Sequence, residues 1–375
     1  MKTQHDPEAI LRAAGVQEIP LKGSGVILRR ADTIESEPVD WLWKGWLARA
    51  KVHILAGDPG AGKTTIALEL AATITRGGRW PDGSIAEPGD VLIWSGEDDF
   101  ADTIKPRLQR AGADLARVHF IAGIETNGRK RPFDPAKHTA ELSEAIAAMQ
   151  RPALVVIDPL VSALSGDSHN NAETRRGLQP LSDLAIARRV AVIGIHHLSK
   201  GTQGRQPLER VTGSLAIGAL ARLVFFAARG KGEALDEDGR LLVRVKSNIG
   251  PDGDGFQYTL EQRPLEASPD ISASGIVWGA AVKGRPAALL AKLEGAEPSA
   301  KGDSRAVSES KGFLQDMLTA GPMPQKAIMA EAQGAGISPA TLRRAKDGLG
   351  VQAVRRPGDS GTEGAWWWRV PERGS

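Results

Sequence analysis

Short apolar runs alternate with helix-compatible stretches in the middle of the chain, between residues 39 and 263. The apolar runs lie at residues 51–56, 90–95, 117–122, 153–158 and 190–195. Segments with helical spacing, such as residues 62–76 and 171–188, separate most of these runs. Near-continuous apolar strands that alternate with helices are typical of a parallel sheet covered on both faces. The pattern predicts an α/β domain with a central, mostly parallel sheet.

The segments that flank this domain have other textures. Two strand-like runs, at residues 241–246 and 256–260, are joined by a turn-rich segment and predict an antiparallel hairpin. Residues 1–38 are polar and lack an apolar period, so we interpret them as an N-terminal arm. Residues 264–302 mix Pro, Gly, Ser and Ala around a candidate helix at 286–293, and we interpret them as a linker. The α/β domain is therefore expected to end near residue 263.

Residues 303–375 are expected to form a second, smaller domain. Three helical patterns are followed by two strand-like runs, at residues 304–320, 325–333, 339–348, 351–356 and 365–370. This order predicts a winged-helix-like domain. Ser338 and Pro339 suit the N-cap and first position of the third helix, which is the layout of a recognition helix. Its Arg343, Arg344 and Lys346 are candidates for phosphate contacts, although many winged helices bind protein instead of DNA.

Composition narrows the class of protein. The chain has 375 residues, 41% of them hydrophobic, which is enough for one large core and a smaller module. No apolar run reaches the roughly 18–20 residues of a membrane span, so we expect a cytoplasmic protein without membrane contact. The absence of cysteine excludes a disulfide framework, a zinc finger and a thiol nucleophile. The surplus of Lys and Arg lies in residues 301–375, which fits nucleic-acid contact and an ordinary surface about equally.

The segment GDPGAGKT, from Gly57 to Thr64, fits the phosphate-loop pattern G-x-x-x-x-G-K-[ST]. It follows an apolar strand and precedes a helix, as that loop requires. Its backbone N–H groups surround phosphates at the helix N-terminus, where the helix dipole favours anions. Lys63 then reaches the β- and γ-phosphates of ATP, and the Thr64 hydroxyl binds Mg²⁺. The residues expected to bind the nucleotide are Gly57, Asp58, Pro59, Gly60, Ala61, Gly62, Lys63, Thr64 and Thr65.

Two more strands end in acidic residues. The run ALVVID places Asp158 at the end of a buried strand, where a Walker B aspartate holds the water shell of the magnesium ion. In DVLIWSGEDD, Glu97 comes just after the strand that follows the phosphate-loop helix. Because ligands of open α/β sheets bind at the carboxyl ends of strands, Glu97 is predicted to polarise the attacking water. The alternative is that these acids cap the next helix, a role that suits Asp98 or Asp99.

Two adjacent histidines, His196 and His197, end the following strand. Neighbouring side chains of a strand point to opposite faces, so one of them can contact the nucleotide while the other packs. A metal-binding pair is disfavoured because no third clustered ligand follows in the sequence. The position at a strand end indicates a sensor of the γ-phosphate, and a core histidine is the alternative.

The series GDPGAGKT, WSGEDD, LVVID, IHHLSKG, TGSLAIGALAR and VKSN resembles the motif order of RepA-like hexameric replicative helicases, within the RecA-like superfamily of P-loop ATPases. The resemblance covers about residues 40–262. It implies that Glu97 is the catalytic glutamate and His196 the first histidine of the sensor pair. It also nominates Arg222, nine residues after Gly213, as an arginine finger that reaches the ATP of a neighbouring subunit. Lys246 matches the Lys of a Lys-x-Asn motif near the same interface.

This resemblance implies an ATP-dependent, ring-forming DNA helicase that acts in the replication of a plasmid, phage or other mobile element. A homo-hexamer would pass single-stranded DNA through its ring, and the C-terminal domain would bind duplex DNA or protein. Residues 160–170 and 200–210 are then the expected DNA-binding loops. Two alternatives remain: a recombination or repair ATPase without processive unwinding, and a replication initiator or regulator with an ATP-driven assembly switch.

Tryptophans cluster at two places. Trp41, Trp43 and Trp46 precede the first predicted strand, and we interpret them as core packing, with adenine stacking or subunit contact as the alternative. Residues 366–368 are three consecutive tryptophans followed by Arg369. Packing of a wing strand on its own helices is the preferred interpretation, although aromatic residues beside arginine can also hold bases.

Overall fold

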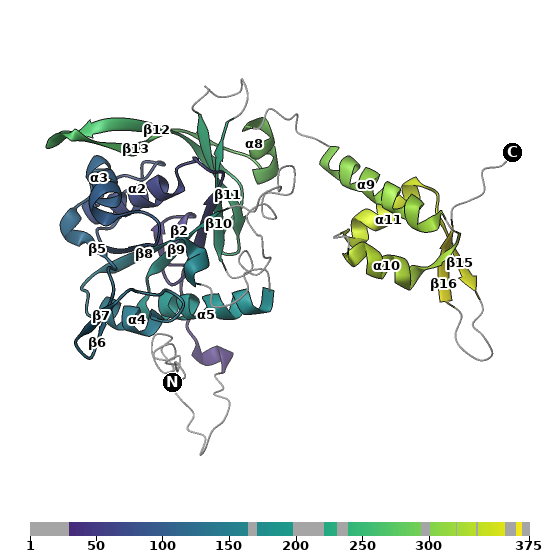
Figure 1. The fold of residues 1–375 in the computed structure, drawn as a ribbon, viewed down its shortest axis with the longest axis horizontal. Coiled ribbons are helices and arrows are strands. Elements are labelled where there is room, and N and C mark those ends of the chain that lie inside the picture. The colour runs from purple at the N-terminus through teal and green to yellow at the C-terminus, as the bar shows by residue number, and fades with distance from the viewer. Residues whose placement is uncertain are drawn as a thin grey trace, which may run out of the picture. The chain divides into compact units, whose positions relative to one another are not determined.

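The computed structural model describes residues 30–163, 171–197, 221–230, 239–293, 301–319, 321–334, 337–356 and 365–369 (Figure 1). The chain divides into two compact units, Met1–Ala296 and Glu297–Ser375. We call them the N-terminal unit and the C-terminal unit. Within the described part of the chain, no helix is long and apolar enough to cross a membrane.

A nine-stranded sheet forms the centre of the N-terminal unit. Its strands are β3 (Val52–Gly57), β4 (Asp90–Ser95), β5 (Val118–Phe120), β8 (Pro152–Asp158), β9 (Ala191–His197), β10 (Leu223–Arg229), β11 (Arg240–Ser247), β12 (Gly255–Leu265) and β13 (Ser268–Val282). They lie in the order β13-β12-β11-β10-β3-β9-β8-β4-β5. The strands from β10 to β5 are parallel, and β11, β12 and β13 add an antiparallel extension beside β10. The predicted α/β fold with a mostly parallel sheet is confirmed.

Helices cover both faces of this sheet (Figure 1). They are α2 (Lys63–Arg76), α3 (Lys105–Arg110), α4 (Thr139–Ala147), α5 (Asn171–Arg188) and α8 (Pro286–Leu293), with short turns η1 (Ala31–Thr33), η2 (Phe100–Ile104), η3 (Leu115–Arg117) and η4 (Leu160–Ala163). On β3, Leu55 packs in one core cluster with Ile66 of α2, whereas Ile54 packs in another with Leu290 of α8. Successive residues of a strand face opposite sides, so each face of the sheet has its own core.

Helix α2 begins at the phosphate loop and is buried along most of its length. It ends at Gly77, whose φ of 64° is left-handed. The N–H of Gly77 donates to Ile74 O at 3.2 Å, and the N–H of Gly78 donates to Thr73 O at 2.8 Å. These bonds satisfy carbonyls of the last turn, which is why the helix stops where a glycine follows.

Two small antiparallel pairs lie outside the large sheet. One is β1 (Trp41–Trp43) with β2 (Leu47–Ala48), and the other is β6 (Ile124–Thr126) with β7 (Arg129–Arg131). Trp43 and Trp46 of the first segment are buried, at 2% and 6% exposure. Trp43 stacks on Trp46 and on Trp80, with ring centroids 4.9 and 5.1 Å apart. The core-packing interpretation of these two tryptophans is confirmed.

The segment predicted as a linker is folded for most of its length. Strand β13 pairs with β12 from Gly255↔Val282 to Leu265↔Ser268, and α8 then packs through Leu289 and Leu290. The expected end of the α/β domain near residue 263 was wrong, because the unit extends to Ala296. Strand β13 contains Ser, Ala, Gly and Pro and is half exposed at the edge of the sheet, so its composition resembles that of a linker.

The C-terminal unit combines three helices with a three-stranded antiparallel sheet. Its elements are α9 (Lys301–Leu318), β14 (Met323–Pro324), α10 (Gln325–Gly334), α11 (Pro339–Gly348), β15 (Gln352–Arg356) and β16 (Ala365–Arg369), with sheet order β14-β16-β15. Ser338 caps α11 by accepting from the Thr341 N–H at 3.2 Å. Trp368 is buried in a core with Leu314 and Leu342, whereas Trp366 is 52% exposed. The helices and strands follow the predicted order, with β14 added.

Candidate nucleotide-binding site

The phosphate loop connects the end of β3 to the start of α2. Lys63 folds back across the loop, and its Nζ donates to Gly57 O and Asp58 O, both at 3.1 Å. Burial lowers the pKa of Lys63, and the nearby carboxylates of Asp158, Asp58 and Glu97 oppose that shift. The ammonium therefore lies where the loop turns around a phosphate, with acidic groups that keep it charged.

Asp158 ends β8, and its carboxylate reaches the phosphate-loop helix. The Thr64 hydroxyl donates to Asp158 Oδ2 at 2.7 Å. The other oxygen, Oδ1, is buried without a hydrogen-bond partner among the described residues. Burial raises the pKa of Asp158, and the bond from Thr64 opposes that shift. A hydroxyl and a carboxylate with an unused buried oxygen form the hard oxygen set that Mg²⁺ prefers, so these residues fit the ion.

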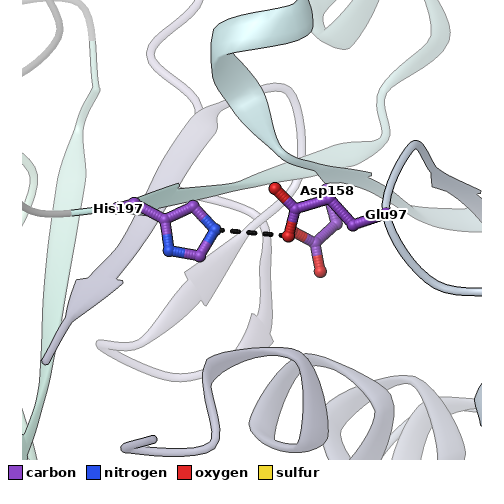
Figure 2. Close-up of side chains that lie close together, drawn as sticks. All are labelled: Glu97, Asp158 and His197. Atoms are coloured by element: carbon purple, nitrogen blue, oxygen red, sulfur yellow. Dashed lines mark ion pairs between the residues drawn. The ribbon is translucent and has the colours of Figure 1, made fainter. Parts of the chain in front are cut away.

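Glu97, Asp158 and His197 lie together at the carboxyl ends of three strands (Figure 2). One ligand atom from each lies within 4.8 Å of the others, and His197 Nε2 is 3.5 Å from Glu97 Oε2. Glu97 is 55% exposed and His197 is 53% exposed, so water reaches both side chains. The cluster combines a carboxylate open to solvent with a buried carboxylate that faces the phosphate loop.

The three acidic residues after β4 have different partners. Asp99 caps the next helical turn by accepting from the N–H groups of Ala101 at 2.7 Å and Asp102 at 3.2 Å. Asp98 Oδ2 accepts from Arg107 at 3.1 Å. Glu97 has no such cap or arginine partner among the described residues and lies beside Asp158 instead. The capping alternative thus holds for Asp99, while Glu97 stays the candidate base.

Strand β9 lies between the phosphate-loop strand β3 and the Asp158 strand β8. Its register puts His196 beside Ala56 and His197 beside Gly57. Burial, followed by His197 and Lys63, lowers the pKa of His196 to about 4, so this histidine is neutral near pH 7. The sequence nominated His196, but the structure brings His197 against Glu97. No sequence signal distinguished the two adjacent histidines.

The two predicted cations, Arg222 and Lys246, lie at the opposite end of the sheet. The Arg222 N–H donates to Val52 O at 3.0 Å, and Lys246 Nζ donates to Ala221 O at 3.0 Å. Val52 starts β3 and Gly57 ends it, which separates the two levels by roughly 16 Å at about 3.3 Å per residue. Neither cation therefore lies beside its own phosphate loop.

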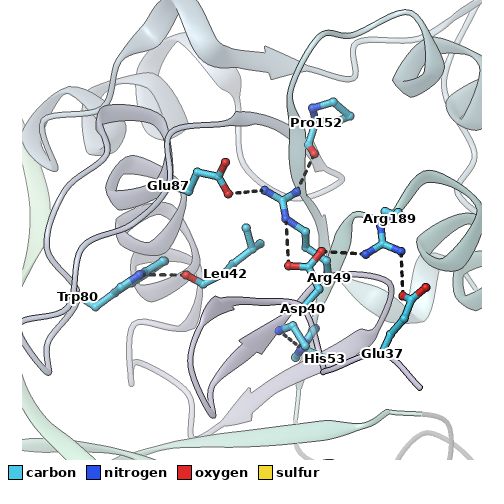
Figure 3. A network of polar contacts seen from close by, with 10 residues as sticks. Glu37, Asp40, Leu42, Arg49, His53, Trp80, Glu87, Pro152 and Arg189 are labelled. Atoms are coloured by element: carbon cyan, nitrogen blue, oxygen red, sulfur yellow. Dashed lines mark hydrogen bonds and ion pairs between the residues drawn. The ribbon is translucent and has the colours of Figure 1, made fainter. Parts of the chain in front are cut away.

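Other charged groups surround this amino end of the strands (Figure 3). Arg49 donates to Pro152 O at 3.0 Å and pairs with Asp40 and Glu87, while Arg189 pairs with Asp40 at 3.2 Å. Burial lowers the pKa of Lys51, and Arg222 and Arg189 lower it further. Burial and Arg222 likewise lower the pKa of Lys246. Lys51, Arg222 and Lys246 thus repel one another in a region that favours an anion.

Several predicted features lie outside the described residues. They are Gly213, most of the first expected DNA-binding loop and all of the second, residues 164–170 and 200–210.

Comparisons with known proteins agree with this geometry. Residues 18–203 match the model of the AAA domain family. The DNA repair protein RadA of Brucella abortus is 27% identical over 218 residues, which are 57% of this chain and 40% of that protein. RadA of Mycobacterium tuberculosis is 27% identical over 170 residues, which are 44% of this chain and 30% of that protein. The chain thus spans less than half the length of these curated relatives.

Among solved structures, an ATPase domain aligns at 16% identity and a TM-score of 0.42, over 56% of this chain and 82% of its own. The phosphate loop joins the AAA-model match to a strand order in which β9 separates β3 from β8. Together, the family match and the observed fold identify a RecA-like P-loop ATPase domain in this chain.

Proposed function

We propose that the chain is an ATP-dependent DNA helicase of the ring-forming, RepA-like kind, acting in the replication of a plasmid, phage or other mobile element. ATP hydrolysis is supported above all by the 2.7 Å contact between Thr64 and Asp158, with Glu97 beside it. Ring formation is supported by the position of Arg222 and Lys246, which lie remote from their own phosphate loop. A homo-hexamer would bring these cations to the ATP of a neighbour.

In this mechanism, Lys63 neutralises charge on the β- and γ-phosphates, and the loop N–H groups hold the phosphate oxygens. Thr64 and Asp158 would hold Mg²⁺, which supplies further neutralisation of the phosphate oxygens when bound. Glu97 accepts a proton from water as the water oxygen attacks the γ-phosphorus. The bond from that phosphorus to the leaving oxygen of ADP breaks, and Arg222 of the neighbouring subunit stabilises the charge that develops.

The two histidines connect this chemistry to the rest of the domain. His196 is neutral and lies near Lys63, and His197 lies against Glu97, so both can exchange hydrogen bonds when the γ-phosphate leaves. Strand β9 would pass that change to the segment that follows it. We assign γ-phosphate sensing to His196, as the family resemblance implies, and positioning of Glu97 to His197.

DNA is the proposed partner. Single-stranded DNA would pass through the ring, and the winged-helix-like C-terminal unit would contact duplex DNA through α11. Arg343 and Arg344 of that helix are exposed, whereas Lys346 lies 5.3 Å from the Trp368 ring and is engaged inside the unit. A protein partner for α11 is the alternative.

A second candidate function is a recombination or repair ATPase that does not unwind DNA processively. The match to two proteins named DNA repair protein RadA favours it. Because both candidates share the nucleotide chemistry, the test must measure DNA unwinding separately from ATP turnover.

The test uses the full chain with ATP, Mg²⁺, single-stranded DNA and a forked duplex. The helicase proposal expects turnover stimulated by single strands together with strand separation of the fork, and a Lys63→Ala control that does neither. Stimulated turnover without strand separation would favour the repair ATPase. Turnover that DNA does not stimulate would point to an assembly switch in an initiator or regulator.

A further inference from the structure

The antiparallel hairpin formed by β12 and β13 reaches the phosphate loop. In Figure 1 the hairpin runs past the end of the sheet toward α2 and α3. Its strands pair in register at Tyr258↔Trp278 and Leu260↔Ile276. Both Tyr258 and Leu260 contact residues that immediately precede α2, so two far segments of the sequence meet here.

The first contact is a hydrogen bond. The Tyr258 hydroxyl donates to the backbone carbonyl of Ala61 at 2.6 Å, and Tyr258 is only 1% exposed. Burial raises the pKa of Tyr258, so the phenol keeps its proton and remains a donor. Its ring also packs on Trp278, with centroids 5.8 Å apart, which limits the positions that the hydroxyl can take.

The second contact is steric. Gly62 has a left-handed φ of +81°, and a Cβ added there would lie 2.9 Å from both terminal methyl carbons of Leu260. Leu260 therefore closes the space on the hairpin side of Gly62. Together the two side chains restrain the peptide group that links Ala61 to Gly62 on its carbonyl side and at its next Cα.

The orientation of that peptide group decides where one phosphate-binding donor points. In a trans peptide, the C=O and the following N–H point in opposite directions. A carbonyl of Ala61 that is held toward Tyr258 therefore directs the N–H of Gly62 away from the hairpin and toward the inside of the loop. Phosphate loops bind their anion through such N–H groups.

We propose that Tyr258 is a positioning residue for nucleotide binding, which fixes the Ala61–Gly62 peptide of the phosphate loop from the neighbouring hairpin. This inference rests on the proposed binding of ATP. The hydroxyl contributes preorganisation, because a donor already aimed at the phosphate need not be ordered when the ligand binds. The ring contributes core packing, which is a separate effect.

Tyr258→Phe separates the two contributions, because it keeps the ring and removes the hydroxyl. Losing one hydrogen bond of ordinary net strength should weaken binding of ATP and ADP about fivefold. Phe256→Leu is the matched control: Phe256 is a buried neighbour on the same strand that packs on Trp43 and Trp46. It should lower the melting temperature without changing either Kd. Equal Kd values for Tyr258→Phe and the unmodified protein would overturn the proposal.

A second readout uses the fact that Tyr258 is the single tyrosine of the chain. Protein labelled with 3-fluorotyrosine should give one ¹⁹F resonance, which shifts as ADP or ATP saturates the loop. Lys63→Ala, labelled in the same way, should show no shift at those concentrations. A resonance that does not move while calorimetry shows nucleotide binding would contradict the inference alone. A protein that binds no nucleotide in calorimetry would contradict the proposed ATPase instead.

Discussion

At the carboxyl ends of the parallel strands the N-terminal unit gathers the phosphate loop, Asp158 and Glu97, whereas at the amino ends it gathers Lys51, Arg222 and Lys246. The first end has groups for binding phosphate and for activating water. The second has cations, yet lies about one strand length from that chemistry. The difference suggests that one chain supplies two unlike halves of an active site.

Sheet geometry explains this division. Loops that follow parallel strands all emerge at one edge, so residues after β3, β4, β8 and β9 meet there. Strand β11 runs antiparallel to β10, so its last residues, including Lys246, return to the amino edge beside Arg222. If the carboxyl edge of one subunit meets the amino edge of the next, each interface completes a site. A monomer would then hydrolyse ATP slowly.

The largest effect is expected at the carboxyl end. Lys63→Ala should abolish measurable ATP turnover and weaken nucleotide binding, because it removes the cation that neutralises the β- and γ-phosphates. Turnover would be measured by phosphate release and binding by calorimetry. Near-normal turnover would contradict the ATPase assignment of the whole site.

The next largest effect should come from the amino end. A finger supplied by a neighbour is worth on the order of 10³-fold or more in rate, so Arg222→Ala should lose most turnover and keep nucleotide affinity. The measurement is the ratio of kcat to Kd effects in one series of protein concentrations. Full turnover of Arg222→Ala would eliminate a finger role for this residue.

Mixing the two variants tests whether the halves belong to different subunits. Lys63→Ala and Arg222→Ala fail at opposite halves of an interface, so mixed rings regain some interfaces with both groups intact. Partial recovery of ATP turnover is expected after subunit exchange. No recovery, with exchange demonstrated by fluorescence energy transfer, would argue that the two residues do not meet across subunits.

A smaller loss is expected at the base. Glu97→Gln keeps the shape of the side chain but cannot accept the proton of water, so turnover should fall by about 10²-fold while ATP still binds. Asp98→Asn is the matched control, because Asp98 is bonded to Arg107 and not to the cluster. A severe loss in Asp98→Asn with normal Glu97→Gln would move the base to Asp98.

The smallest effect concerns stability against pH, and both ends contribute. Burial lowers the pKa of His53 and of His196 to about 4, below the usual 6.5. The unfolded chain therefore binds more protons between these values, and the free energy of unfolding falls as pH decreases from about 6.5 to 4. His53→Gln should flatten this dependence, since His53 Nε2 accepts from the Ala48 N–H at 3.1 Å only when neutral. Urea unfolding at several pH values measures it, and an unchanged slope would contradict the role of His53.

The sequence predicted the parts of the site whose physics is local. The phosphate loop, Asp158 and Glu97 each follow an apolar run, and strand ends of a parallel sheet share an edge, so their meeting could be expected. The choice between His196 and His197 could not be made, because it depends on the rotation of one strand end. Strand β13 was missed because its pairing with β12, not its composition, makes it a strand. The bond from Tyr258 to Ala61 joins residues 197 positions apart, which no local pattern indicates.

The place of β3 in the sheet has a consequence for synthesis of the protein. Its two neighbours, β9 and β10, begin at Ala191 and Leu223, well over a hundred residues after β3 ends. At about 5–20 residues per second, the phosphate-loop strand waits on the order of ten seconds or longer for its first hydrogen-bonded partner. Until then the apolar residues of β3 have no sheet to join, and contacts of this sequence separation fold slowly. The segment that later holds ATP is therefore the one that most needs protection from aggregation while the chain is still emerging.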